Sequence, residues 1–131
     1  MTTAPALELD HIRRSYGQVT AVDDVSLAVA KGEFLTLLGP SGSGKTSTLR
    51  LIGGFERPDS GEIRINGRRV DHLPPYARDT ATIFQTGALF PHKTVAENVI
   101  YGLKMHKIDK AESVKRVKDA LAMVRLTGFE E

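Results

Sequence analysis

Hydrophobic and polar residues alternate near the N-terminus of the chain, as is typical of strands. The segment LELDHI (7–12) alternates in part, and VSLAV places Val25, Leu27 and Val29 on one face. Because successive side chains of a strand point to opposite faces, the pattern predicts half-buried strands. We therefore expect the N-terminal part of the chain to form antiparallel sheet.

The next segment, EFLTLL (33–38), is almost continuously apolar and runs directly into Gly39. Such a run predicts a strand that is covered on both faces. Residues 45–52 then predict a helix, which we expect to end at the Gly53–Gly54 pair. The predicted order is therefore a buried strand, a glycine-rich loop and a helix.

Turn residues predict more antiparallel sheet further along the chain. The segment PDSG (58–61) has turn chemistry, and Asn66–Gly67 between two extended arms indicates a hairpin. The segment TATIFQ (80–85) predicts a short strand, and TGALFPHK (86–93) predicts a loop.

Two helices are predicted after this loop. Thr94 with Glu97 matches a capping box, and Asp109 with Glu112 has a similar spacing, while Gly128 is the expected terminator of the second helix. The apolar positions recur at helical spacing. Val95, Val99 and Leu103 mark one face of the first helix, and the second helix has a stripe that predicts core in preference to a recognition surface, formed by Val114, Val117, Leu121 and Val124.

The composition is that of an ordinary globular protein of one modest domain, with 131 residues, 40% hydrophobic and 26% charged. The chain has no cysteine, which excludes disulfides, thiolate metal sites and cysteine nucleophiles. A net charge of +2 is too small to indicate nucleic acid as a partner. Neither a secretory signal nor an apolar run of about 20 residues is present, so we expect a cytoplasmic location.

The segment GPSGSGKT carries the candidate chemistry. Gly39, Gly42 and Gly44 allow a loop to turn its backbone N–H groups toward a polyphosphate. Lys45 supplies a cation for the terminal phosphates, and the Thr46 hydroxyl can ligate Mg²⁺ at the N-terminus of the predicted helix. The segment therefore predicts a site for a polyphosphate and Mg²⁺.

The spacing Gly39-x4-Gly44-Lys45-Thr46 is the P-loop pattern, and it lies between a predicted strand and a predicted helix, as that motif requires. A dinucleotide-binding fingerprint is disfavoured because Ser47 stands where its third glycine should be. The structural alternative is a glycine-rich surface turn.

The residues around the P-loop indicate a family. The stretch from YGQVTAVDDVSLAV through the P-loop to PDSGEIRINGRRV, followed by TIFQTGALFPHKTVAENVIYGL, resembles the ATP-binding subunits of ABC transporters along almost the entire chain. Importer subunits for polyamines, ferric iron, sulfate or sugars are most similar, and the spermidine/putrescine type most of all. The resemblance implies an α/β P-loop NTPase fold: the N-terminal part of an ABC ATPase domain, with an antiparallel β subdomain, the P-loop strand and helix, and the start of a helical subdomain.

The resemblance also implies roles for individual residues. Tyr16 would stack on adenine and Val22 would pack near the same base; on the residues alone, the first is an ordinary strand-end aromatic and the second a core valine. The phosphates and Mg²⁺ would be bound by the loop residues Gly39, Pro40, Ser41, Gly42, Ser43, Gly44, Lys45, Thr46 and Ser47.

Gln85 matches the Q-loop glutamine of the family, which approaches Mg²⁺ and the attacking water. The amide suits that role because its oxygen can coordinate metal and accept from water. Without the resemblance, Gln85 would be a loop residue facing solvent. Gly87 replaces an aromatic residue common in relatives, which affects packing against a membrane subunit, and His92 is a loop residue rather than the late catalytic histidine of the family.

The partners that the resemblance implies are a transmembrane permease and a second ATPase subunit, at the inner face of the cell membrane. The later motifs of the family are absent from residues 86–131: an LSGGQ-like signature, the Walker B strand with its Asp-Glu end, and the switch histidine. We therefore interpret 1–131 as a partial nucleotide-binding domain, whose EFLTLL segment lacks neighbouring strands and whose hydrolysis requires further segments. Two alternatives stay open, a non-hydrolytic half-domain that needs a partner chain and a non-functional truncated product.

Overall fold

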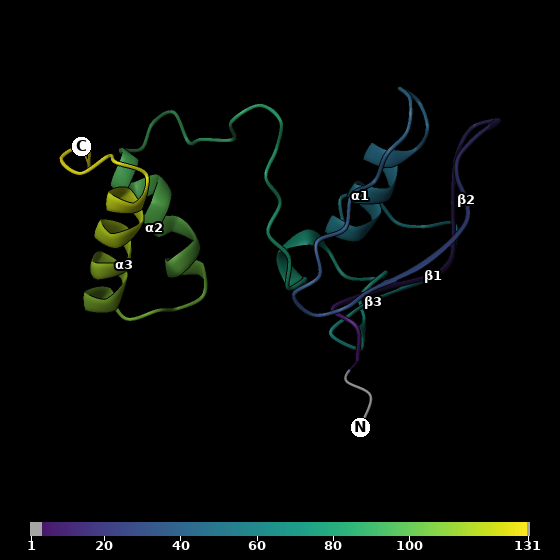
Figure 1. Ribbon diagram of the computed structural model, residues 1–131, viewed down its shortest axis with the longest axis horizontal. Coiled ribbons are helices and arrows are strands. Elements are labelled where there is room, and N and C mark those ends of the chain that lie inside the picture. Colours follow the sequence, from purple (N-terminus) through teal and green to yellow (C-terminus); the bar gives the residue numbers. More distant parts are fainter. Residues whose placement is uncertain (1–3, 131) are drawn as a thin grey trace. The chain divides into compact units, whose positions relative to one another are not determined.

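The computed structural model describes residues 4–130, and the chain divides into two compact units between Thr82 and Ile83. The first unit contains β1 (Leu7–Tyr16), β2 (Val19–Val29), α1 (Lys45–Gly53), β3 (Ser60–Ile65), β4 (Arg68–Arg69) and the short 3-10 helix η1 (Pro75–Ala77) (Figure 1). The second unit contains α2 (Val95–Met105) and α3 (Lys110–Met123).

The strands of the first unit form one sheet in the order β2-β1-β3-β4, in which all neighbours are antiparallel. This confirms the antiparallel sheet expected from the alternating N-terminal pattern. The hairpin between β3 and β4 turns at Asn66 and Gly67, whose φ angles are 50° and 78°. Two consecutive positive φ angles are what a tight two-residue hairpin requires, and Asn-Gly adopts them readily.

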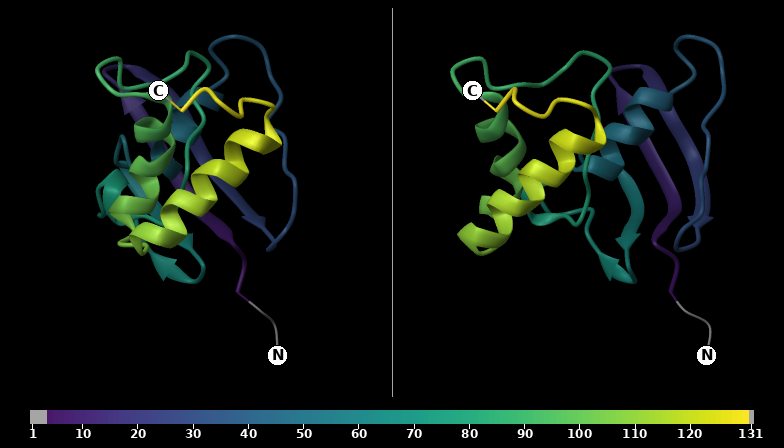
Figure 2. Two further views of the ribbon diagram at one scale, coloured as in Figure 1. Left: turned by 90° about the vertical axis from the view of Figure 1, so that its left-hand side faces the viewer. Right: turned by 60° about the vertical axis from the view of Figure 1, so that its left-hand side comes forward.

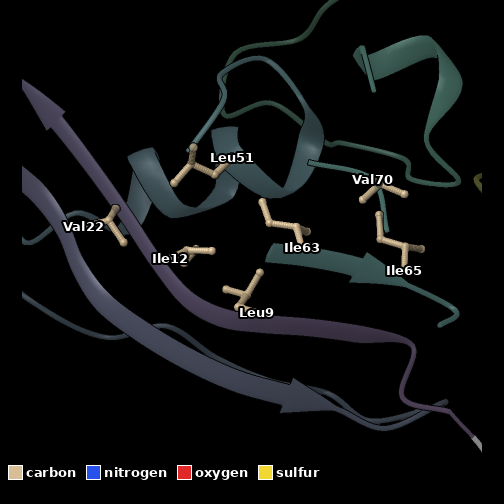
Figure 3. Close-up of a cluster of buried hydrophobic side chains, with 7 residues drawn as sticks. All are labelled: Leu9, Ile12, Val22, Leu51, Ile63, Ile65 and Val70. Atoms are coloured by element: carbon tan, nitrogen blue, oxygen red, sulfur yellow. The ribbon is translucent and has the colours of Figure 1, made fainter. Parts of the chain in front are cut away.

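The core of the first unit lies between the sheet and α1, which runs along one face of the sheet (Figure 2). Figure 3 shows the side chains of this cluster converging from the strands and the helix: Leu9, Ile12, Val22, Leu51, Ile63, Ile65 and Val70. Leu51 of α1 is completely buried, as are Ile12 and Ile63. Burial of Leu51 fixes α1, and with it the end of the glycine-rich loop, on the sheet.

The C-terminus of α1 is fixed in two ways. Gly54, with φ 81°, follows the helix and donates its N–H to carbonyls of the last turn, which confirms the predicted stop. The side chain of Arg78 is buried and donates from Nη1 to the Leu51 carbonyl at 2.6 Å and to the Ile52 carbonyl at 2.9 Å. Burial of Arg78 lowers the pKa of its guanidinium group. The sequence analysis missed this residue, because an arginine in a polar segment gives no indication of burial.

Two predicted strands are wrong. Neither EFLTLL (33–38) nor TATIFQ (80–85) forms a strand, and Figure 2 shows both segments as loops. Phe34 is 93% exposed and Ile83 is 98% exposed. A strand is stable only when neighbours satisfy its backbone groups, and no strand within residues 4–130 pairs with either segment. The lack of neighbours for EFLTLL agrees with the expectation from the family resemblance.

The second unit consists of two packed helices, as predicted. The capping box of α2 is present, since the Glu97 N–H donates to Thr94 Oγ1 at 3.2 Å and the Thr94 N–H donates to Glu97 Oε2 at 2.9 Å. Asp109 caps α3 by accepting from the N–H groups of the first turn. None of the helices in the described range is long and apolar enough to cross a membrane.

The predicted apolar stripe of α3 is only partly buried. Val117 and Leu121 are buried, whereas Val114 is 43% exposed and Val124 is 62% exposed. The helix ends at Met123, several residues before the predicted terminator Gly128. The helical period therefore identified the buried face of α3, but the predicted helix is longer than the observed one.

Candidate functional site

The glycine-rich loop borders a pocket of about 410 Å³ in the first unit. Its lining comes from the end of β1, the start of β2, the loop and the first turn of α1, and consists of Tyr16, Ala21, Ser41, Gly42, Ser43, Gly44, Lys45, Thr46 and Ser47. The structure thus brings Tyr16 together with most of the loop residues singled out in the sequence.

Val22 does not line this pocket. Its side chain is 3% exposed and belongs to the buried cluster, so the alternative of a core valine describes it in this structure. Ala21, the residue before it, lines the pocket instead. In a strand, neighbouring side chains point to opposite faces, so a core valine leaves its neighbour facing the pocket.

The backbone of the glycine-rich loop has a conformation that requires glycine at two positions. Gly42 has φ 79° and Gly44 has φ 88°, both in the left-handed region that other residues rarely adopt. A Cβ at Gly44 would lie 2.1 Å from the carbonyl oxygen of Ala21. Gly44 is also the N-cap of α1, and no side chain caps that helix end. The first turn of α1 lines the pocket and its N–H groups have no side-chain acceptor, an arrangement that favours an anion.

The ammonium group of Lys45 lies inside the loop. Its Nζ donates to the carbonyl oxygen of Gly39 at 2.6 Å, to that of Pro40 at 2.8 Å and to Ser43 Oγ at 3.0 Å. These partners are neutral, and no carboxylate lies within ion-pair distance of Lys45 in the described part of the chain. The positive charge is therefore held in place but not neutralised. Phosphate oxygens would be stronger acceptors for it than these carbonyls.

Three hydroxyl residues at the start of α1 have different surroundings. Thr46 and Ser47 line the pocket, whereas Thr48 is buried and donates its hydroxyl to the Gly44 carbonyl at 2.9 Å. Thr48 therefore stabilises the first turn. Residues 4–130 contain no cluster of three or more histidines or carboxylates that could hold a metal. A hydroxyl oxygen suits Mg²⁺, so Thr46 fits a cation that takes its other ligands from phosphates and water.

Tyr16 lies beside the loop and is 41% exposed. Its hydroxyl donates a hydrogen bond to the carboxylate of Glu56, and the guanidinium carbon of Arg14 lies 4.9 Å from the ring centroid. The hydrogen bond from Tyr16, together with the cations of Arg50 and Arg14, holds the pKa of Glu56 below its ordinary value. The sequence analysis missed Glu56 and Arg14, which no sequence motif had marked.

Gln85 is exposed and belongs to the second unit, which begins at Ile83. The P-loop belongs to the first unit, so the approach of Gln85 to a metal and a water stays a prediction. His92 is also exposed, with its ring 6.0 Å from that of Phe90, as expected for a loop residue.

Together, an antiparallel sheet, a glycine-rich loop and a helix that begins at the loop lysine define a P-loop protein. The family model described as ABC transporter matches residues 22–131, which is most of the chain. The chain therefore belongs to the ABC transporter family.

Curated relatives match nearly the whole chain. The spermidine/putrescine import ATP-binding protein PotA of Legionella pneumophila (strain Philadelphia 1) is 54% identical over 98% of this chain and 35% of its own length. The proteins of the same name from Rubrobacter xylanophilus and Pseudomonas aeruginosa (strain UCBPP-PA14) are 50% and 52% identical, each over 95% of this chain and 33% and 34% of their own lengths. The chain thus spans about a third of the length of these relatives.

A solved structure supports the assignment at the level of the fold. The ATP-binding cassette MJ0796, in a dimeric post-hydrolysis state bound to ADP and Pi, matches with a TM-score of 0.78 and 28% identity. The match covers 95% of this chain and 60% of that one. The expected fold class, the N-terminal part of an ABC ATPase domain, is confirmed.

Proposed function

We propose that this chain is the nucleotide-binding part of the ATP-binding subunit of an ABC importer, and that it binds MgATP in the pocket at the P-loop. One observation carries the proposal: the pocket combines an uncapped helix N-terminus and an unneutralised lysine with an exposed aromatic ring. The first two features suit a polyphosphate, and the third suits a flat base.

Each part of the pocket has a role in this proposal. The ring of Tyr16 stacks on adenine, while the loop N–H groups and Lys45 bind the phosphates. The Thr46 hydroxyl supplies a ligand to Mg²⁺, which when bound neutralises phosphate charge. Gln85 is the residue that orients the attacking water and contacts the metal, once the two units are suitably placed.

The transported solute is proposed from the relatives, which are named for spermidine and putrescine import. The corresponding partners are a permease in the membrane and a second ATPase subunit, with the chain at the inner face of that membrane. Hydrolysis requires a nucleophile-positioning group and charge stabilisation from several sides. Residues 86–131 contain no signature, Walker B or switch-histidine motif, so we assign turnover to segments that carry these motifs.

The second candidate is a non-hydrolytic half-domain that works with a partner chain. It is favoured by the exposed apolar residues of segment 33–38, which include Phe34 and Leu38 at 93% and 89% exposed. An apolar segment without neighbours is a surface that further strands can cover.

The proposal is tested by reconstitution. Phosphate release from MgATP is measured with the full chain alone and with a companion polypeptide that carries the signature and the Asp-Glu strand. We expect turnover only in the mixture, abolished by Lys45→Ala and retained by Lys31→Ala, which changes an exposed lysine of a turn. A pair that associates tightly but never hydrolyses ATP would leave the non-hydrolytic half-domain as the function. Transfer of phosphate to a metabolite would instead indicate another class of P-loop enzyme.

A further inference from the structure

The side chain of Tyr16 is held by contacts at both its hydroxyl and its ring. The hydroxyl donates to the carboxylate of Glu56, which lies just beyond the C-terminus of α1. That carboxylate also accepts from Arg50 Nη1 at 3.3 Å, and its side chain is only 16% exposed. An ionised acceptor that is largely screened from water makes a strong and directional partner for a phenol.

One face of the Tyr16 ring is occupied by a cation. The Arg14 guanidinium lies 4.9 Å from the ring centroid, and its Nε is 3.5 Å from Glu56 Oε2. This geometry is that of a cation–π contact, in which the planar guanidinium covers the ring. A base that stacks on Tyr16 therefore has only the opposite face available.

Arg14 is in turn fixed to the sheet through Asp59. Its Nη1 donates to Asp59 Oδ1 at 3.0 Å, and the backbone N–H of Ser15 donates to Asp59 Oδ2 at 2.7 Å. The backbone N–H of Asp59 donates to the Arg13 carbonyl at 2.8 Å. Asp59 is thus bound to three consecutive residues of β1, so the guanidinium is held in one place relative to that strand.

We propose that Arg14 and Glu56 are positioning residues that fix the Tyr16 ring, with one face covered by Arg14 and the other open to a nucleobase. The proposal rests on the proposed binding of ATP. It adds that the contribution of the base to affinity depends on these two side chains, whereas the contribution of the phosphates does not.

The reason is that a freely rotating ring must lose its side-chain freedom when a base stacks on it. A ring already fixed at both its hydroxyl and its face has lost that freedom before binding. Removal of either contact therefore weakens stacking without touching the loop that holds the phosphates. Neither Arg14 nor Glu56 lines the pocket, which separates their effect from direct contact with the ligand.

The experiment compares two ligands on the same 131-residue chain. The affinities of MgATP and of magnesium tripolyphosphate, which has no base, are measured by calorimetry. The ratio of the MgATP affinity to the tripolyphosphate affinity isolates the contribution of the base. From the usual strength of a cation–π contact or a charged hydrogen bond, we expect Arg14→Gln and Glu56→Gln each to lower this ratio about three- to tenfold. Tyr16→Ala should lower it further, and tripolyphosphate affinity should not change.

Two controls distinguish positioning from a general structural effect. Arg13→Gln removes a neighbouring arginine that pairs with Asp23 at 2.8 Å instead, and it should leave the ratio unchanged. Tyr16→Phe keeps the ring but loses the hydroxyl, so it should lower the ratio as Glu56→Gln does. In the Tyr16→Phe background, Glu56→Gln should then have a smaller effect, because only its contact with Arg14 remains to be lost.

The outcomes separate the two proposals. Binding of MgATP with an ATP-to-tripolyphosphate ratio that depends on Tyr16 but not on Arg14 or Glu56 would overturn the positioning proposal alone. Equal losses of ATP and tripolyphosphate affinity in Arg14→Gln and Glu56→Gln would also overturn it, because both residues would then act on the whole fold. Absence of binding for both ligands in the unaltered chain would overturn the proposed function, and positioning with it.

Discussion

Two groups of apolar residues in the first unit have opposite surroundings. Ile12 of β1 and Ile63 of β3 are completely buried, whereas Phe34 and Leu38 are 93% and 89% exposed. The difference lies in the backbone, since β1 has a hydrogen-bonded neighbour on each side and segment 33–38 pairs with no strand of the described range. An apolar run therefore becomes a buried strand only where a neighbouring strand and a covering helix are available.

The largest expected effect comes from the buried residues in this comparison. Ile12→Ala should lower the free energy of unfolding by about 2–5 kcal/mol, because it removes buried methylene groups and leaves a cavity. Phe34→Ala should change it by less than about 0.5 kcal/mol, since the ring is already in water. Urea unfolding of both variants measures the two values. Equal losses would show that segment 33–38 is packed in solution.

A second effect concerns the backbone of the sheet. Gly61 in β3 has φ 89°, and a Cβ there would lie 2.5 Å from the carbonyl oxygens of Asp10 and His11. Gly61→Ala should lower the free energy of unfolding by about 2 kcal/mol or more, because the new Cβ meets these oxygens and alanine is strained at this left-handed φ. Gly87→Ala is the matched control, since nothing lies within 4 Å of its Cβ position and its φ is not in that region. Similar unfolding midpoints for the two variants would contradict the observed close approach.

A third effect concerns α2, a helix whose start is stabilised by a local capping box and not by a distant strand. Thr94→Ala should destabilise α2 by about 1 kcal/mol, because it removes one half of the capping box. Hydrogen exchange should show faster exchange in the first turn of α2, and unchanged exchange in β1. Thr94→Ser, which keeps the hydroxyl, should restore protection; a variant with faster exchange in both units would mean that the two do not unfold separately.

The smallest effect is a pH dependence at an exposed pair of side chains, His11 of β1 and Asp24 of β2. The hydrogen bond between His11 Nδ1 and Asp24 Oδ1, 2.7 Å long, and the charges of Asp24 and Asp10 raise the pKa of His11 against the opposing charge of Arg13. A pKa raised by folding contributes stability below the unfolded value of 6.5, and this stability is lost as the pH rises through the folded value.

Urea midpoints of the chain should therefore decrease slightly as the pH rises from about 6 to about 8. In His11→Gln this part of the decrease should be absent. If the urea midpoints of the two proteins decreased equally with pH, Asp24 would not raise the pKa of His11.

The sequence predicted the elements whose cause is local. Asn66–Gly67 specified a hairpin, Gly54 a helix end and Thr94 a capping box, because each acts through its own backbone. It failed where the cause is distant, as for the strands predicted at 33–38 and 80–85.

The candidate site shows the same division. The spacing from Gly39 to Thr46 predicted the loop, because the residues of a P-loop that bind phosphate follow one another in the sequence. Glu56 and Arg14 could not be predicted, since their importance comes from contacts with Tyr16 that only the folded chain creates. Val22 was a pocket candidate by resemblance, yet the alternation of β2 placed it in the core.

The central claim is that the pocket beside Lys45 binds the phosphates of a nucleotide. Calorimetric titration of MgATP into the full chain, Lys45→Ala and Lys31→Ala tests it most directly. We predict saturable binding that Lys31→Ala retains and that Lys45→Ala weakens at least about tenfold, because a charged hydrogen bond to phosphate is lost. Equal affinity in all three proteins, or no binding in any, would contradict the claim.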